Sequence, residues 1–195
     1  MRAFGTGQPR GISSSALGRV GVSTHDEMGE AMAELTKLES KLGEVTGLAM
    51  AAQAATKKVV TLAKEEHPEL VARLEQMHEE AAETERRCTE LADTLEGKKT
   101  AILEEARATK SIGADMMSTY LDEDADALDG FEFLTMAEAG EVGHWSVLKT
   151  LNKSAGSAAI GELVEWALPI QQRHYSSVTQ TSLEIASEEN PNDPA

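Results

Sequence analysis

Apolar residues recur three or four positions apart along most of the chain, which is the period of an amphipathic helix. The first such stripe follows Thr24-His-Asp-Glu27, whose hydroxyl and carboxyl have the spacing of a capping box, and continues to about Glu66. Later stripes predict helices over about 69–95, 102–120, 128–151 and 158–186. Because no stretch of useful length alternates apolar and polar residues as a strand would, the pattern predicts an all-α protein.

The first predicted helix is long. A helix from Thr24 to Glu66 would extend roughly 60 Å at 1.5 Å per residue, beyond any of the other predicted helices. We therefore expect either a break near Gly43 and Gly47 or first turns that overhang the rest of the molecule. Pro68 then marks a turn or the start of the second helix.

The spacing of the helices predicts how they are connected. Two helix pairs are separated by a connection of about 30 residues that contains the 102–120 helix. A four-helix bundle with one long crossover between its second and third helices is the ferritin-like plan, whereas a simple up-down bundle uses short loops throughout. We therefore expect a ferritin-like four-helix bundle over residues 24–188.

The two ends of the chain differ from this bundle. Residues 1–23 are rich in Gly and Ser and contain three arginines but no acid, which predicts a mobile N-terminal arm. An alternative is that this arm docks onto a partner or a larger assembly. Residues 189–195 predict a frayed acidic tail.

The composition of the chain indicates which partners the protein can bind and where in the cell we expect it. A formal charge of −16 argues against nucleic-acid binding, since neutralising phosphates requires clustered Lys and Arg. No apolar run approaches the roughly 20 residues of a membrane span, and the N-terminus lacks the apolar core of a secretory signal. One cysteine, Cys88, allows no intrachain disulfide. We expect a cytoplasmic protein that binds neither nucleic acid nor membrane.

The candidate chemistry lies on the helix predicted over 128–151, where polar side chains interrupt an apolar stripe. Leu134, Glu138, Glu141, Trp145 and Leu148 are three or four residues apart, so they share one helix face. Acids on such a face cannot be buried at low cost unless they have partners. The stripe therefore predicts a site inside the bundle that binds a metal ion or protons.

Histidines on or near three helices could supply those partners. His78 follows Glu75 by one turn, His144 follows Glu141, and His174 follows Gln171. Carboxylates and histidines that point inward from several helices form the metal sites of helix bundles. The opposing interpretation is that each histidine is a hydrogen-bonded core residue, as a single inward histidine often is.

The order and spacing of these residues resemble the YciE/YciF family of ferritin-like proteins over about residues 44–186. The similarity includes Pro68-Glu69-Leu70, the stretch that begins His78-Glu-Glu, the crossover helix, Glu138 with Glu141, and Leu163-Val-Glu165 before Gln171. The resemblance implies a cytoplasmic bundle, often dimeric, with a dinuclear iron or similar metal site and a link to stress responses. On the positions that match, it implies that His78, with Glu75 one turn before it, and the acids Glu138 and Glu141 belong to the metal site. If the chain binds a metal, we expect Glu138, Glu141, His78 and His174 to bind it directly.

Two departures from the family pattern weaken the implied site. The family usually has Glu where this chain has Gln171, and no acid occurs at 51–53, Glu44 being the nearest. A dinuclear site needs about four carboxylates to balance two metal ions, so this chain favours one metal, a histidine-rich site or no metal. The candidate ligands are Glu75, His78, Glu138, Glu141, His144, Gln171 and His174, with Glu165 as a further acid.

Two functions therefore remain open. The first is a ferritin-like homodimer that binds iron or manganese in its core and reacts with oxygen or peroxide. The second is a metal-free bundle of the same fold that serves as a structural, interaction or cargo protein. No catalytic residue is indicated, so the sequence does not decide whether the protein is an enzyme.

Overall fold

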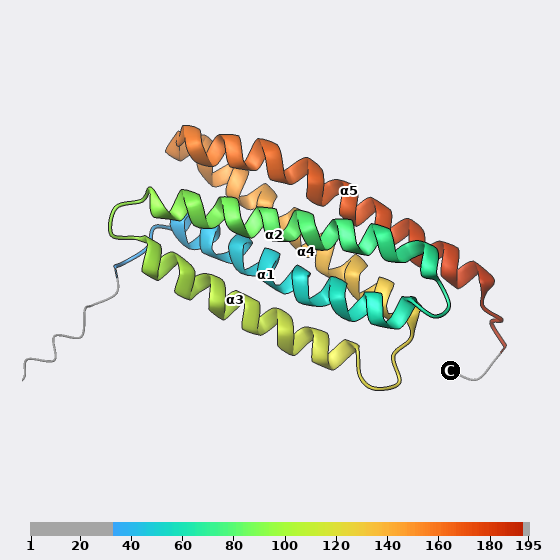
Figure 1. Ribbon diagram of the computed structural model, residues 1–195. Coiled ribbons are helices and arrows are strands. Elements are labelled where there is room, and N and C mark those ends of the chain that lie inside the picture. Colours follow the sequence, from blue (N-terminus) through green and yellow to red (C-terminus); the bar gives the residue numbers. More distant parts are fainter. Residues whose placement is uncertain (1–32, 193–195) are drawn as a thin grey trace, which may run out of the picture. The chain divides into compact units, whose positions relative to one another are not determined.

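The computed structural model describes residues 33–192, and these residues are helical apart from short turns, without a strand among them (Figure 1). The elements are α1 (Lys37–Ala63), η1 (Pro68–Leu70), α2 (Val71–Asp93), α3 (Lys99–Tyr120), α4 (Ala127–Ala155) and α5 (Ala158–Glu188). The predicted all-α class is confirmed. The predicted N-terminal arm, residues 1–23, and the Thr24 capping box lie outside the described residues, as do residues 193–195 of the predicted tail.

The first helix begins later than predicted. Thr36 is its N-cap: the Thr36 hydroxyl accepts a hydrogen bond from the Glu39 amide at 3.2 Å, and the Glu39 carboxylate accepts one from the Thr36 amide at 2.7 Å. Residues 33–36 are not helical. The prediction of a helix from Thr24 to Glu66 was therefore wrong, because a second capping box with the same Thr-x-x-Glu spacing starts the helix at Lys37.

No break occurs at the two glycines of α1. The helix runs without interruption through Gly43 and Gly47, and both glycines face α3. A Cβ atom at Gly47 would lie 2.3 Å from the Ala106 carbonyl oxygen, and one at Gly43 would lie 2.7 Å from Glu105 Cβ. These glycines therefore allow α3 to approach the backbone of α1 closely, which is a packing role and not a helix-breaking one.

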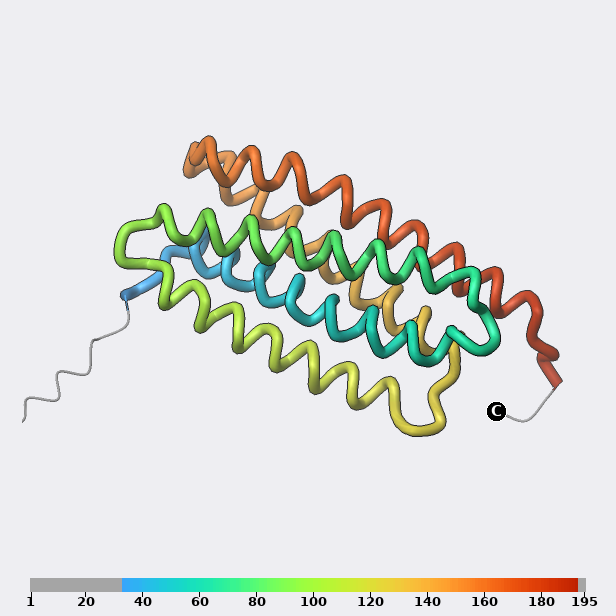
Figure 2. Tube along the Cα trace, viewed as in Figure 1, coloured from blue at the N-terminus to red at the C-terminus, as the bar shows by residue number. Residues whose placement is uncertain are grey.

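The helices lie side by side and alternate in direction along the chain. Figure 1 shows α1, α3 and α5 running one way and α2 and α4 running the other. The trace in Figure 2 shows α3 returning along the outside of α1, so that α4 starts at the end of the molecule where α2 also starts. α1 contacts α2, α3 and α4, while α5 contacts α4 and α2. Of the described helices, none has both the length and the apolar character that crossing a membrane requires.

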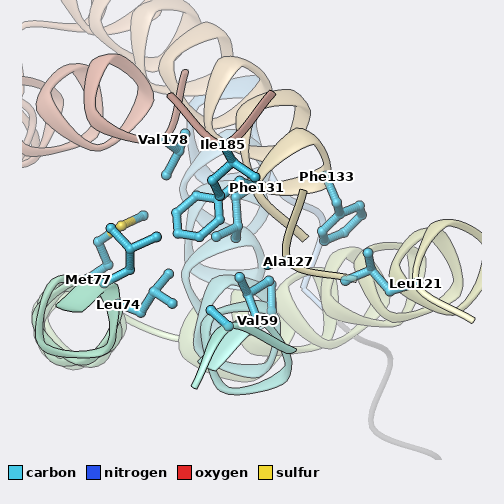
Figure 3. Close-up of a cluster of buried hydrophobic side chains, with 13 residues drawn as sticks. Val59, Leu74, Met77, Leu121, Ala127, Phe131, Phe133, Val178 and Ile185 are labelled. Carbon is cyan, nitrogen blue, oxygen red and sulfur yellow. The ribbon is translucent and has the colours of Figure 1, made fainter. Parts of the chain in front are cut away.

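The apolar core is divided into two clusters. One cluster includes Val59, Leu74, Phe131, Val178 and Ile185, near the C-terminal end of α1 (Figure 3). The other, toward the opposite end, is built around buried residues that include Leu42, Cys88, Trp145, Leu148 and Ile160. Several core helices also carry buried polar side chains. Those of α1, Thr46 and Thr56, donate to carbonyl groups of their own helix. We call the following set on α2, α4 and α5 the middle layer: Thr84, Glu138, Glu141, Gln171 and His174.

Candidate functional site

Two carboxyl groups of the middle layer lie on consecutive turns of α4. Glu138 and Glu141 are only 2% and 3% exposed. Phe131 precedes them and Trp145 follows them on α4, and both aromatic side chains are fully buried. Because these large side chains fix the inward face of α4 on either side, the two carboxyls between them must also face inward. We refer to Glu138 and Glu141 as the acid pair.

The acid pair lacks the hydrogen bonds that buried carboxyls normally make. One oxygen of each group, Oε2, is sealed from solvent without a hydrogen-bond partner among the described residues. Burial raises the pKa of Glu141 to about 8. Burial and repulsion by Glu141 raise the pKa of Glu138 well above its ordinary value. The pair therefore holds a proton at neutral pH, because burial disfavours the charged form.

The nearest nitrogen base to the acid pair is His174 on α5. Its Nδ1 atom lies 3.7 Å from Oε2 of Glu138, beyond hydrogen-bond length, while its Nε2 atom lies 2.5 Å from Oε2 of Glu80 on α2. Since a carboxylate accepts and does not donate, Nε2 carries the proton and the Nδ1 lone pair faces Glu138. Burial lowers the pKa of His174 despite Glu80, so the ring is neutral at pH 7.

Glu80 is held in place by several donors. Arg173 donates to the Glu80 oxygen that His174 also contacts, at 2.6 Å, and Gln76 donates to the other oxygen at 3.1 Å. Partial burial works to raise the pKa of Glu80, but the hydrogen bonds from His174, Gln76 and Arg173 outweigh it and the pKa lies below its ordinary value. Glu80 is therefore a charged group that orients His174.

The helix-two candidates lie away from the acid pair. His78 Nδ1 lies 3.0 Å from the Gln53 carbonyl oxygen and 3.4 Å from the Thr56 hydroxyl, so the ring is engaged at the interface of α2 with α1. Glu75 is exposed on α2. Sequence spacing placed both residues near the core stripe, but they flank the buried positions Leu74 and Met77 and do not share their direction.

The remaining candidates divide between the middle layer and the surface. Gln171 is buried on α5, one turn before His174. His144 is 38% exposed, and its Nδ1 atom lies within 2.9 Å of Oε2 of Glu44 on α1 without the alignment of a hydrogen bond. Glu165 is exposed on α5. His144 therefore pairs with the helix-one acid at the rim, and not with the acid pair.

A groove lies between α1, α3 and α4 and reaches the acid pair. Its volume is about 390 Å³. Glu138 and Glu141 line it, and Glu44, Glu105 and His144 also belong to its lining. The rest of its surface is mainly apolar and includes Leu48, Ala52, Ile112, Met116, Phe133 and Leu134. We call this cavity the α1–α3–α4 groove.

Small residues on α1 leave this space open. Ala51 and Ala52, at the positions where the family resemblance implies an acid, line the α1–α3–α4 groove. The next residue, Gln53, turns to α2 and donates a hydrogen bond to Glu85 at 2.6 Å. At positions 51–53 of α1, therefore, no carboxylate faces the acid pair as the acid of the family pattern would.

The donor set does not fit a dinuclear metal site. Within residues 33–192, no three side chains of His, Cys, Asp or Glu lie close enough together to hold one metal ion. The predicted ligands are instead spread over the structure. Glu138 and Glu141 lie near His174, with Gln171 one turn before it on α5. His78 lies at the α1–α2 interface, His144 at the groove rim, and Glu75 on the exposed side of α2. Binding of iron or manganese remains a prediction.

One member of the site was not predicted. Glu80, in the stretch that begins His78-Glu-Glu, was not among the candidate ligands, yet it is the residue that binds His174. Its position three residues after Met77, at the edge of the core stripe, was the signal available in the sequence. The chain matches no family model, no curated protein and no solved structure, so the likeness to YciE/YciF proteins remains a resemblance of residue spacing.

Proposed function

We propose that this chain is a ferritin-like bundle that binds a small, largely apolar molecule in the α1–α3–α4 groove. The ferritin-like plan is supported by the direction of α2 and α4, which run the same way and so need a connection as long as the bundle (Figure 1). α3 supplies that connection with 22 residues, about 33 Å at 1.5 Å per residue.

The observation that carries the proposed function is the position of the acid pair against an apolar cavity. Ligand sites are typically cavities of about 300–1,000 Å³, lined by apolar side chains and a few polar groups with perturbed pKa values. The groove, at about 390 Å³, falls within this range. A buried polar group without a partner costs roughly 1–3 kcal/mol, so a ligand that donates to Glu138 or Glu141 would recover part of that cost.

The test uses two glycines on the exposed side of α4. A Cβ atom added at Gly140 or at Gly143 meets no atom within 4 Å, so both positions tolerate a side chain, but only Gly140 lines the groove. We expect the neutral fluorescent probe N-phenyl-1-naphthylamine to bind the wild-type protein once per chain. Gly140→Leu should abolish this binding and Gly143→Leu should preserve it. Absence of saturable binding, or equal binding by the two variants, would overturn the proposal.

A second candidate function, binding of iron or manganese, is favoured by the Glu80–His174–Glu138 arrangement. Histidines that bind metals commonly donate their second ring N–H to a carboxylate, as His174 does to Glu80, and the free Nδ1 lone pair faces Glu138. This candidate predicts about one metal ion per chain in protein grown with iron and manganese and purified without chelators, lost in Glu138→Ala. If the purified protein contains no metal and chelators do not change its melting temperature, binding of iron or manganese would be contradicted.

The family resemblance also leads us to propose a cytoplasmic homodimer. Val147 on α4 and Leu183 on α5 are 47% and 62% exposed, and such apolar side chains are candidates for a subunit contact. Light scattering coupled to size-exclusion chromatography gives the molar mass directly. A mass near 21 kDa at micromolar concentration would contradict the dimer, since one chain has a mass of 20.9 kDa.

A further inference from the structure

We infer that the α1–α3–α4 groove selects a hydrophobic cation, an alkyl chain ending in an ammonium group that lies against Glu138 and Glu141. This inference rests on the proposed function of the groove and adds the chemical class of its ligand. It is carried by the signs of the charges around the groove, the unpaired oxygens of the acid pair and the apolar character of the remaining walls.

The groove is acidic. The titratable side chains among its described lining residues are four glutamates, at 44, 105, 138 and 141, and His144, with no Lys or Arg among them. From α5, the neutral ring of His174 faces Glu138 at 3.7 Å. A ligand in this groove therefore meets several carboxyl groups and no opposing cation except a protonated His144.

The acids differ in whether they already have a cationic partner. Glu44 forms an ion pair with Lys41 on its own helix and lies 2.9 Å from Nδ1 of His144. Glu138 and Glu141 have no such partner and make no hydrogen bond within the described residues. The acid pair is therefore the part of the groove where a positive charge would gain the most.

The acid pair also distinguishes between cations and anions as ligands. An ionised carboxylate is an acceptor only, and an ammonium group carries three donors, so the two groups are complementary. A fatty-acid carboxylate would instead bring a negative charge into a groove that holds Glu44 and Glu105 and no Lys or Arg, and it would oppose ionisation of the acid pair. Repulsion of this kind, inside a poorly solvated cavity, disfavours anionic amphiphiles.

The walls exclude small or highly charged cations as the preferred ligand. Lining residues on α1 extend from Glu44 to Ala55, a length of about 16 Å at 1.5 Å per residue. Ile112 and Met116 of α3 and Phe133 of α4 line the same groove. A hydrated inorganic ion would leave these side chains uncovered, and a polyamine would place further charges against them. An alkyl tail buries them instead, at roughly 25 cal/mol per Å².

Binding a cation should displace protons from the acid pair. Burial holds the pKa of Glu141 at about 8 and that of Glu138 above its ordinary value, so the empty pair is protonated at pH 6 to 7. An ammonium group favours the ionised carboxylate, and the displaced proton leaves to solvent. Affinity for the cation should therefore rise with pH, by as much as about tenfold per pH unit for each proton released.

The experiment compares three ligands with the same ten-carbon chain: decylamine, decanol and decanoate. Each competes with N-phenyl-1-naphthylamine on the full-length protein at pH 6.0 and pH 8.0, where decylamine stays protonated because its pKa resembles that of lysine. We expect decylamine to bind at least tenfold more tightly than decanol at pH 8.0, and the ratio to fall at pH 6.0. Calorimetry in two buffers of different ionisation enthalpy should show proton release with decylamine only.

Matched variants assign the effect to the acid pair. The double variant Glu138→Gln with Glu141→Gln keeps the shape of both side chains and removes their charge, so it should bind decanol as before and lose the preference for decylamine. Glu132→Gln, on the exposed side of the same helix, should keep the preference.

The outcomes separate this inference from the function on which it rests. Equal affinity of the wild-type protein for decylamine and decanol, or tighter binding of decanoate, would overturn the cationic ligand while leaving the groove as a binding site. Retention of the decylamine preference in the folded double variant would overturn the role of the acid pair. Failure of the probe and all three ligands to bind would overturn the proposed function itself.

Discussion

Nε2 of His174 on α5 lies 2.5 Å from Oε2 of Glu80 on α2, a contact between residues 94 positions apart in the chain. The same oxygen accepts a hydrogen bond from Arg173, so one carboxylate joins two consecutive residues of α5 to α2. This contact fixes which ring nitrogen of His174 faces the acid pair. It is therefore the structural basis for any chemistry between His174 and Glu138.

Removing the Glu80 carboxylate should destabilise the protein, because it leaves the buried Nε2–H of His174 without an acceptor. We expect Glu80→Ala to lower the free energy of unfolding by about 1–3 kcal/mol, measured by urea denaturation at pH 7. The control is Glu79→Ala, an exposed neighbour on the same helix, which should change stability by less than about 0.5 kcal/mol. Equal effects of the two substitutions would contradict the role of Glu80.

The acid pair should make stability fall as the pH rises. The folded protein keeps a proton on Glu141 up to about pH 8, whereas the unfolded chain loses it near pH 4.3. Between these values the folded state binds more protons, so this group's contribution to the free energy of unfolding decreases with rising pH. Relative to wild type, Glu141→Gln should gain up to about 1.4 kcal/mol per pH unit over this window and level off above it.

Urea denaturation of both proteins at half-unit steps from pH 5.5 to pH 9 measures this difference. Glu132→Gln, an exposed acid on the same helix, is the matched control and should show no such gain. A constant difference between Glu141→Gln and wild type across the range would mean that Glu141 is ionised in the folded protein. The comparison of variants cancels the opposite trend from His174, whose lowered pKa makes stability rise with pH until the unfolded imidazole is neutral, above about pH 6.5. Glu80, whose pKa is also lowered, changes its contribution only below about pH 5, outside this range.

Replacing glycine by alanine should lower the stability of the protein at Gly47 of α1 and raise it at Gly143 of α4. At Gly47 the new Cβ atom would lie 2.3 Å from a backbone oxygen of α3, which forces the two helices apart and should cost about 1–3 kcal/mol. At Gly143 the Cβ atom meets nothing, so Gly143→Ala should stabilise by about 1 kcal/mol through the higher helix propensity of alanine. Thermal unfolding of the two variants provides the comparison. Destabilisation by Gly143→Ala would reveal a neighbour of α4 outside the described residues or in another subunit.

Cys88 should be unreactive in the folded protein. Its side chain is fully buried, and burial raises the pKa of the thiol to about 12, so little thiolate forms at pH 8. We expect 5,5′-dithiobis(2-nitrobenzoic acid) to modify Cys88 only as fast as the protein unfolds, and stoichiometrically within seconds in 6 M guanidinium chloride. Rapid labelling in native buffer would contradict the packing of Cys88 in the core.

Hydrophobic periodicity predicted much of this fold because helix faces are a local property. The inward positions of Leu134, Glu138 and Trp145 follow from their spacing on one helix, and the structure buries all three. The start of α1 was missed because Thr24 and Thr36 each begin a Thr-x-x-Glu sequence, and spacing alone does not rank two equivalent caps.

The parts of the site that spacing did not predict depend on contacts between helices. His78 and His174 each follow another candidate ligand by three residues. His78 is nevertheless engaged by the backbone of α1, and His174 by a carboxylate of α2. The α1–α3–α4 groove exists because the small side chains of Ala51 and Ala52 leave space that no neighbouring helix fills. In the sequence these alanines are ordinary helix-forming residues. Such gaps have no signature in the pattern of a single helix.

The close fit of α3 onto the glycines of α1 has a consequence for how this bundle can change over evolutionary time. α3 contacts mainly α1 and has few contacts with α4, so its half-exposed side chains at Ile112 and Met116 line the groove without being part of either apolar cluster. Substitutions there can alter the size and polarity of the groove while the two clusters stay intact. One helix can thus acquire a new specificity at little cost to folding, while the acid pair on α4 stays in place.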